Sequence, residues 1–556
     1  MSQPTCLRRI DYTSSHRQAA YGLILQVSQR EDMRHIFKIV GILGQSAALL
    51  SLSTALAVGN GSASDNRTAA NTYGSASQSP NASPSSKNWS AMGVVADGVT
   101  DNTAALNALP TGVHIVGDCP AGKAIVVKNP WIWHSNLNLK IQAGCTIDSY
   151  VTGGGKIPTY AITQPSLTYP LTDIYVDGLQ ISSHYAASED TILKLWVNNF
   201  TLVHWTVTAS GGVMVIRGSN QVIAYGKATG TFPAIGNPGI RHVGNEPKVA
   251  TTAGQPANVY IHDNYVQSGD GAYQVCQPLQ ALVWTDVNSD DILFENDTGL
   301  SNQSSLILVG QRPQDVGNNT NFSCSNIVFN NVNGSGMNKT IFMSSLGASN
   351  PVSNITFENS VIDAAGSNQN EGAIQLVSQP NGTISNVSFE NYTVRNYGET
   401  ALTTQGNVTQ LSFDSGQMDT PSNGHFATIV LSDATQASIT NNTIDAYFGD
   451  ALQIGPNGSD NPVSQATVTG NVFNGIGNGY AAVRMFNVNL AKVATNTMNS
   501  IAGATSATGI FFSSSGSKGP GTTNSTATGN DLTGINGTTP IVFAPDQGNS
   551  IANNQE

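Results

Sequence analysis

The acidic residue best placed to do chemistry is Asp270, which lies within Ser268–Val275 (SGDGAYQV). This stretch follows an alternating apolar pattern at Asn258–Ile261, which is typical of a β-strand. A carboxyl group in a tight turn beside a strand can act as the general acid in glycosidic cleavage. Asp270 is therefore the first candidate catalytic residue, and Asp263 and Asp286 are candidate partners nearby in the sequence.

A similar corner, an acid followed by a small residue and an apolar strand, recurs at Glu371, Glu399 and Asp450. Glu371 and Glu399 are one repeat apart, so stacked strands would bring their backbones to about 5 Å. Two close carboxyls have separated pKa values, and this separation supplies one acid and one base. These two residues form a second candidate catalytic pair. The structural alternative is that such acids only cap turns through backbone N–H groups.

A third interpretation combines Asp263, Asp270 and Asp286 into a Ca²⁺ site, because this ion binds several carboxylate oxygens. With Arg241 or Lys248 as the base, such a site would suit a polysaccharide lyase. Ca²⁺ enters the interpretation only through this alternative. The hydrolase interpretation needs no metal or other cofactor.

Basic and aromatic residues near Asp270 could bind a sugar chain. Arg241, His242, Tyr273 and Trp284 are the candidate substrate-binding residues. Exposed aromatic faces can stack on the apolar faces of sugars, and a few polar groups then set the orientation. The alternative for each ring is packing between neighbouring repeats.

A recurring phrase shows which elements must position these residues. It reads Asn/Gln-φ-x-φ, with φ apolar, and its copies start about 24 to 35 residues apart, a spacing typical of solenoids. One unit cannot bury its apolar side alone, so it must stack on the next. The pattern predicts about 10–13 coils of short strands. The copies begin at Asn258, Asn326, Asn354, Asn386, Gln410, Gln436 and Gln465.

The segment before the repeats resembles a known family. Asp97-Gly98 predicts a turn, Asp101 the N-cap of a short helix, Val113–Val116 a strand and Pro120-Ala-Gly122 another turn. This order is similar to the opening of pectate-lyase-like proteins, which include the glycoside hydrolase family 28-related group and phage tailspikes. The resemblance implies an all-β, right-handed, single-stranded parallel β-helix with a short N-terminal capping helix.

The resemblance extends to few of the family's catalytic residues. Polygalacturonases of this family use a Gly-Asp-Asp turn, whereas this chain reads Gly-Asp270-Gly. The upstream family acid would fall near Asn237–Arg241, where no acid stands. Only Asp270 matches, so the polygalacturonase catalytic set is not intact.

An Asn follows most of the apolar strands by two or three residues. In a parallel stack these side chains would align at about 4.8 Å per coil and hydrogen-bond up and down the column. We therefore expect a structural role. The residues are Asn264, Asn296, Asn331, Asn359, Asn391, Asn441, Asn471, Asn496 and Asn530.

The N-terminal region predicts export. A basic start at Met33-Arg34-His35 precedes an apolar run that ends at Ala55-Leu56-Ala57, which fits a cleavage site. We expect a targeting segment at 1–57, a disordered linker at 58–88 and the β-helix domain at 89–556. The mature protein would be secreted, periplasmic or on the cell surface, with no membrane span.

The cysteines agree with export. Four follow the expected cleavage point, and an even number in an exported chain permits disulfides. Cys119–Cys145 with Cys276–Cys324 is the sequence-near arrangement among three possible ones.

The low charge content and the negative net charge limit the kinds of partner that the protein can bind. Only 10 % of the 556 residues are charged, and the net charge of −12 argues against nucleic acid and anionic membranes. It also disfavours a strongly anionic substrate unless a local basic patch overrides it. The chain is predicted to be a secreted glycoside hydrolase that acts on a polysaccharide. The alternatives are the Ca²⁺-dependent lyase and a non-catalytic glycan-binding or adhesin-like β-helix. The sequence does not determine the oligomeric state.

Overall fold

The computed structural model describes residues 86–556 except for short segments. The segments left out are 121, 152–159, 185–190, 210, 230–238, 243–257, 270, 277–285, 302–303, 311–320, 338, 349, 365–371, 399, 420–426, 448, 456–462, 514–520 and 544–546. The side chains of 286–289 and 321–322 are also not described. The expected targeting segment at 1–57 and most of the expected linker lie outside the described residues.

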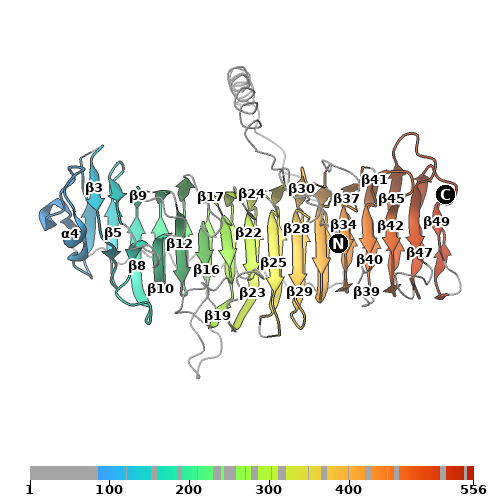
Figure 1. The fold of residues 1–556 in the computed structure, drawn as a ribbon, viewed down its shortest axis with the longest axis horizontal. Helices are drawn as coiled ribbons and strands as arrows, with labels where there is room; N and C mark the ends of the chain where they lie inside the picture. Colours follow the sequence, from blue (N-terminus) through green and yellow to red (C-terminus); the bar gives the residue numbers. More distant parts are fainter. Residues whose placement is uncertain are drawn as a thin grey trace, which may run out of the picture. The chain divides into compact units, whose positions relative to one another are not determined.

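The described chain winds as a single-stranded parallel β-helix, as expected (Figure 1). Each coil contributes one strand to sheet A, then one to sheet B, then one to sheet C. In one coil these are β16 (Val259–His262), β17 (Tyr265–Ser268) and β18 (Tyr273–Val275). The next coil returns to sheet A at β20 (Ile292–Glu295), which pairs in parallel with β16. The winding is right-handed, the hand that parallel crossover connections strongly prefer.

Sheet B has 15 strands among the described residues, so the stack is longer than the 10–13 coils expected. The Asn/Gln phrase marks only sheet A, and the first coils lack it. Sheet B comprises β3 (Ala124–Val127), β6 (Thr146–Ser149), β9 (Gln180–Ser183), β11 (Thr206–Thr208), β14 (Lys227–Thr229), β17, β21 (Thr298–Ser301), β24 (Asn333–Gly336), β27 (Val361–Asp363), β30 (Thr393–Arg395), β33 (Gln417–Met418), β37 (Thr443–Asp445), β41 (Val472–Ile476), β45 (Thr497–Ser500) and β48 (Asp531–Gly534).

Sheets A and C run along the same axis, and β10 takes part in both of them. Sheet A comprises β1 (Ser86–Asn88), β2 (His114–Gly117), β5 (Asn138–Ile141), β8 (Leu171–Asp177), β10 (Thr191–Val203), β13 (Gln221–Ala224), β16, β19 (Asp286–Ser289), β20, β23 (Asn321–Asn330), β26 (Val352–Glu358), β29 (Ile384–Glu390), β32 (Val408–Asp414), β35 (Ala434–Thr435), β36 (Ser438–Thr440), β39 (Val463–Ser464), β40 (Thr467–Thr469), β43 (Val488–Asn489), β44 (Lys492–Ala494), β47 (Thr526–Thr528) and β50 (Ser550–Ala552). Sheet C comprises β4 (Trp131–Ile132), β7 (Tyr160–Thr163), the first part of β10, β12 (Gly212–Arg217), β15 (Ile240–His242), β18, β22 (Ile307–Gly310), β25 (Ile341–Ser345), β28 (Ile374–Ser378), β31 (Leu402–Gln405), β34 (Ile429–Leu431), β38 (Leu452–Ile454), β42 (Ala481–Met485), β46 (Thr508–Phe512) and β49 (Ile541–Val542).

The core is built from aligned apolar columns inside the coils. The last apolar position of the repeated phrase stacks as Phe329, Phe357, Phe389 and Phe413, with ring centroids 4.7–4.8 Å apart. Phe294 extends this stack by one coil. Near-parallel stacking of this kind adds about 0.5–1.5 kcal/mol per pair beyond the area buried. The phrase is therefore the sequence signature of the core, as the repeat spacing predicted.

The Asn residues form two kinds of column, where the sequence suggested one. Asn296, Asn331 and their counterparts are exposed and have φ near 54°, the left-handed conformation that Asn tolerates. Asn471, Asn496 and Asn530 are buried, and each side-chain oxygen accepts a hydrogen bond from the preceding coil's Asn amide. Both columns are structural, as expected.

The N-terminal end is closed by a cap. It consists of β1, the 3₁₀ turn η2 (Ser90–Met92) and the short helix α4 (Thr103–Asn107). Asp101 accepts a hydrogen bond from the Thr103 N–H, close to the capping role expected for it. Trp131 packs edge-on against Trp133 and is itself buried, so these rings seal the cap. The described residues begin at Ser86, and the expected domain boundary at 89 stays a prediction.

Two further expectations can be checked. Cys119 is bonded to Cys145 and Cys276 to Cys324, which confirms the sequence-near pairing. No helix within the described residues combines the length and apolarity that crossing a membrane requires.

Candidate functional site

The outer face of sheet C carries the cluster of polar groups most suited to binding a charged ligand. Strand pairing aligns Lys194 with Val215, Val215 with Arg241, and Arg241 with Gln274, one residue per coil. Their neighbours along each strand point into the core, so these residues face outward. We call this row the outer C column.

Two cations of the outer C column make specific contacts. The Lys194 ammonium donates to the Tyr160 hydroxyl at 2.8 Å and lies 4.7 Å from the ring centre. Arg241 Nε donates to Gln274 Oε1 at 2.5 Å. Burial, with a smaller contribution from the positive charge of Arg241, lowers the pKa of Lys194 to about 8. The lysine is therefore much closer to losing its proton at neutral pH than an exposed lysine.

A third cation joins them from the next outward position. Arg217 pairs in register with Trp196, and its guanidinium lies 4.2 Å from the centre of the Trp196 ring. Lys194, Arg217 and Arg241 are all less than 9 % exposed. We call these three residues the cationic cluster. Such desolvated cations interact with anions more strongly than exposed ones do.

Two of the expected substrate-binding residues belong to the interior instead. His242 aligns with Ile216 and Val275 on the inward side, and burial lowers its pKa to about 4. The Tyr273 hydroxyl donates to the Thr298 carbonyl at 2.8 Å inside the core. Adjacent residues of a strand face opposite sides, so Arg241 faces outward and His242 inward. Trp284 lies outside the described residues.

The acids expected near Asp270 lie elsewhere on the coils. Asp263 follows β16 at the corner between sheets A and B, and its carboxylate contacts His262 Nδ1 at 2.7 Å. Asp286 begins β19, which pairs with the start of β23 in sheet A. The structure therefore does not bring these two acids together on sheet C. Within the described part of the chain, no group of three metal-binding side chains forms.

The three remaining candidate acids, Asp270, Glu371 and Glu399, lie outside the described residues. The strands that follow the two glutamates are described, and Ile374 of β28 pairs with Leu402 of β31. Each glutamate precedes its strand by three residues in the sequence, and the one-coil separation expected for this pair stays a prediction.

The related corner at Asp450 is described, and there the acid has a structural role. One carboxylate oxygen accepts the Ala481 N–H at 2.6 Å, and the other accepts Arg484 Nε at 2.7 Å. Asp450 thus links two coils. The capping alternative holds at this corner, which makes Asp450 a natural control for the other acids.

A concave region lies on the outer face of sheet B. A cleft of about 490 Å³ is lined by Gly299, Gly334, Asn333, Asp363 and Arg395, among others. Asp363 already accepts hydrogen bonds from Arg395 at 3.2 Å and from the amide of Asn396. Its carboxylate is engaged in structure, so this cleft offers a weaker catalytic site than sheet C.

The strand pairing and winding define the protein as a right-handed parallel β-helix. No protein-family model and no curated protein matches the chain. Solved structures similar to it include tailspike protein 3 of bacteriophage CBA120, at 11 % identity and a TM-score of 0.39, covering 84 % of this chain. This chain spans 61 % of that tailspike's length.

Two further solved structures are similar to this chain. A family 28 exopolygalacturonase of Yersinia enterocolitica is 12 % identical, with a TM-score of 0.37, over 85 % of this chain and 78 % of the enzyme. The tailspike of E. coli bacteriophage HK620, solved with a pentasaccharide, is 12 % identical, with a TM-score of 0.42, over 83 % of this chain and 76 % of the tailspike. The fold assignment rests on the strand pairings of the present chain.

Sequence reasoning missed Lys194, Tyr160, Arg217 and Gln274. A usable signal was present for Lys194, because it is the one charged residue in the apolar stretch Thr191–Val197. A lysine within a fully buried strand must find polar partners, and that requirement marks it as unusual.

Proposed function

We propose that this protein is a secreted enzyme that degrades an acidic polysaccharide bound along the outer C column. The observation that supports this most is the cationic cluster of Lys194, Arg217 and Arg241, gathered on one face of a chain whose net charge is −12. This is the local basic patch that can override the global charge. Carboxylate or sulfate groups of a polysaccharide suit such a patch.

The proposed polysaccharide lies parallel to the β-helix axis. The outer C column repeats once per coil, at about 4.8 Å. From β28 to β49, where it is partly exposed, it offers one contact position after another to an extended chain. Beyond the cationic cluster the same column continues through Gln375, Thr403 and Val430, which are partly exposed. These positions would carry the chain away from the reacting centre.

Cleavage is assigned to the corner acids. Asp270 directly precedes Gly271, whose carbonyl accepts a hydrogen bond from Gln274 at 3.5 Å, and Gln274 in turn binds Arg241. Asp270 is the proposed general acid, and Glu371 with Glu399 is the proposed second carboxylate pair. Export is supported by the two disulfides, which form in oxidising compartments.

A lyase reaction is the second candidate, favoured by the Lys194–Tyr160 contact. Lys194, with a pKa of about 8, would remove the proton α to a uronate carboxylate. The electrons would form the C=C bond as the glycosidic C–O bond breaks, and the leaving oxygen would take the proton of Tyr160. Arg241 would neutralise the carboxylate. This route needs no bound Ca²⁺.

One experiment tests both reactions. The purified protein is incubated with a panel of acidic and neutral polysaccharides, and both new reducing ends and near-ultraviolet absorbance are measured. A hydrolase produces reducing ends without absorbance, and a lyase produces both because the product is unsaturated. Degradation of neutral polymers only would contradict the proposed substrate. No degradation at all would favour the non-catalytic glycan-binding protein.

The pH dependence separates the two mechanisms further. If Lys194 is the base, it must be deprotonated, so the rate rises as the pH increases through about 8. If a protonated carboxyl is the acid, the rate falls as the pH rises above that group's pKa. Lys194→Met should abolish lyase activity, and Lys194→Arg, which stays charged, should not restore it.

A further inference from the structure

A row of aromatic rings, two of them exposed, lies at the corner between sheets A and B, away from the outer C column. His204 and Tyr225 stack with ring centres 5.3 Å apart and planes within 15° of parallel. Tyr225 meets His262 edge-on at 5.1 Å, and His262 stacks on Tyr260 at 4.0 Å. His204, Tyr225 and His262 come from three successive coils. We call these four rings the corner strip.

The backbone at this corner gives an independent reason to notice the corner strip. From β8 onward, the residue that follows most sheet A strands has a positive φ, including 53° at His204 and 54° at Tyr225. Later coils place Asn or Gly at most of the same positions, such as Asn296, Asn331 and Gly470. This conformation is unfavourable for Tyr, whereas Asn and Gly tolerate it and His adopts it more readily than most residues do. Tyr225 therefore adopts a backbone conformation that its residue type disfavours, and such outliers cluster at functional sites.

Two rings of the corner strip are also accessible, whereas His262 is buried. Tyr225 is 52 % exposed and the His204 side chain 63 % exposed. Rings that served only to fill the core would be buried, as Trp205 is beside them in the sequence. The exposed faces are thus available to a ligand.

Carboxylates surround the rings. Asp177 contacts His204 Nδ1 at 2.9 Å, Asp263 contacts His262 Nδ1 at 2.7 Å, and the Tyr260 hydroxyl donates to Glu295. Carboxylate oxygens accept hydrogen bonds from sugar hydroxyls, but they repel acidic sugars. Among the described residues in these contacts, Lys140, 3.4 Å from Asp177, is the one lysine or arginine.

We propose that the corner strip binds a neutral polysaccharide, which lies along the axis with sugar faces against the rings of successive coils. The ring spacings of 5.3 and 5.1 Å are close to the coil repeat, about 4.8 Å. Stacking on aromatic faces and hydrogen bonding to the surrounding carboxylates are complementary ways to hold a pyranose. This surface is separate from the proposed catalytic face and would anchor the enzyme to a second glycan.

The test uses substitutions to a residue that other coils carry at the same corner. His204→Asn and Tyr225→Asn install the residue found at the same corner of other coils, so folding should be retained. The full chain is measured against insoluble cellulose, starch, mannan and β-glucan in pull-down assays, and against soluble forms in affinity gels. Wild type should bind at least one neutral polymer, and the double variant should bind it about tenfold more weakly.

Controls make the result specific. Tyr169 is 76 % exposed and is not part of the corner strip, so Tyr169→Asn should bind like wild type. Degradation of soluble acidic polysaccharide should be unchanged in all variants, which separates this proposal from the proposed catalytic function. The proposal is overturned if wild type binds no neutral polymer, if it binds acidic polymers through these residues, or if the double variant binds normally. Should the double variant fail to fold, Tyr225→Asn alone is measured against the same outcomes.

Discussion

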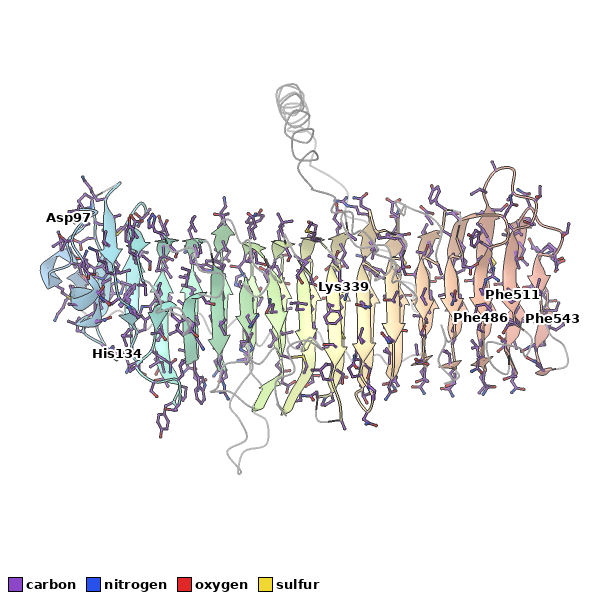
Figure 2. The ribbon with its side chains drawn as sticks, in the orientation of Figure 1. Asp97, His134, Lys339, Phe486, Phe511 and Phe543 are labelled. Atoms are coloured by element: carbon purple, nitrogen blue, oxygen red, sulfur yellow. A yellow bond between two sulfur atoms is a disulfide. The ribbon has the colours of Figure 1, made fainter. Side chains whose placement is uncertain are left out.

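The two halves of sheet C have the same backbone but different outer faces. From β10 to β25 the outer C column is buried and includes Lys194, Arg241 and Phe342. From β34 to β49 the same column is partly exposed and includes Arg484 and Phe511, which lies close to Phe486 in Figure 2. Strand register is continuous between them, so burial here reflects the surroundings of each strand and not its geometry.

The contrast between Arg241 and Arg484 shows what this difference means for function. Arg484 is held by Asp450 at 2.7 Å and lies 4.9 Å from the Phe511 ring centre. Arg241 shares its face with two further cations and lies beside Lys194, whose pKa it lowers. On the proposed function, the same residue type at the same rung serves structure in one half and ligand binding in the other.

The largest effect is expected at the corner acids. Asp270→Asn should reduce polysaccharide degradation about 10²- to 10⁴-fold, the usual contribution of a general acid. Asp450→Asn removes the corresponding acid in the second half, where the carboxylate only links coils, so activity should stay near wild type while thermal stability falls. Equal activities in the two variants would show that the halves do not differ in this way.

A smaller difference is expected for the outward phenylalanines. Phe342 is buried with Leu308 and Val377 in a separate apolar cluster on the outer face. Phe342→Ala should lower the free energy of unfolding by about 3 kcal/mol, and Phe511→Ala by less than about 1 kcal/mol because Phe511 is partly exposed. Urea denaturation followed by circular dichroism measures both values. Similar losses of unfolding free energy would mean that the outer face of sheet C is buried in both halves in solution.

His242 should make stability depend on pH. Its folded pKa is about 4, below the ordinary 6.5, so the unfolded chain binds the proton first as the pH falls. The stabilisation is complete above pH 6.5 and is lost towards pH 4, by on the order of 3 kcal/mol. His242→Leu should remove this dependence. Met485 occupies the same inward column in the second half, so Met485→His should introduce a similar pH dependence of stability. Denaturation of wild type and both variants at pH 4.5 and 7.5 measures this dependence.

The smallest effect concerns the cations. Arg241→Gln should weaken binding of an acidic polysaccharide about 10- to 100-fold through loss of charge-assisted hydrogen bonds. Arg484→Gln should change it less than about twofold, because this cation is paired with Asp450. Affinity electrophoresis at low and high salt measures the difference, which salt should reduce. If Arg484→Gln weakens binding as much, the acidic chain follows the whole column.

Much of the fold was predictable because each coil repeats the same local requirements. The Asn-φ-x-φ phrase marked sheet A, and the Asp97–Gly122 region marked the cap. The number of coils was underestimated because strands such as β4 and β15 have only two or three residues and carry no periodic signal.

The candidate site was less predictable, because it depends on which face of its strand each residue occupies. Neighbouring residues in a strand face opposite sides, so Arg241 and His242 cannot both contact a ligand on sheet C. The sequence does not show which of the two faces outward. Strand register resolves this, and it also reveals that Lys194 and Arg241 share one column although 47 positions separate them in the chain.

The buried Asn column also has a consequence for the protein's tolerance of asparagine deamidation. Asp297 occupies a place in this column, where its carboxyl accepts two hydrogen bonds from Asn264, and burial raises its pKa well above the ordinary value. It is what deamidation of an asparagine would leave behind. The column therefore already accommodates one such product as a neutral acid, so chemical damage at a single rung need not dismantle the stack.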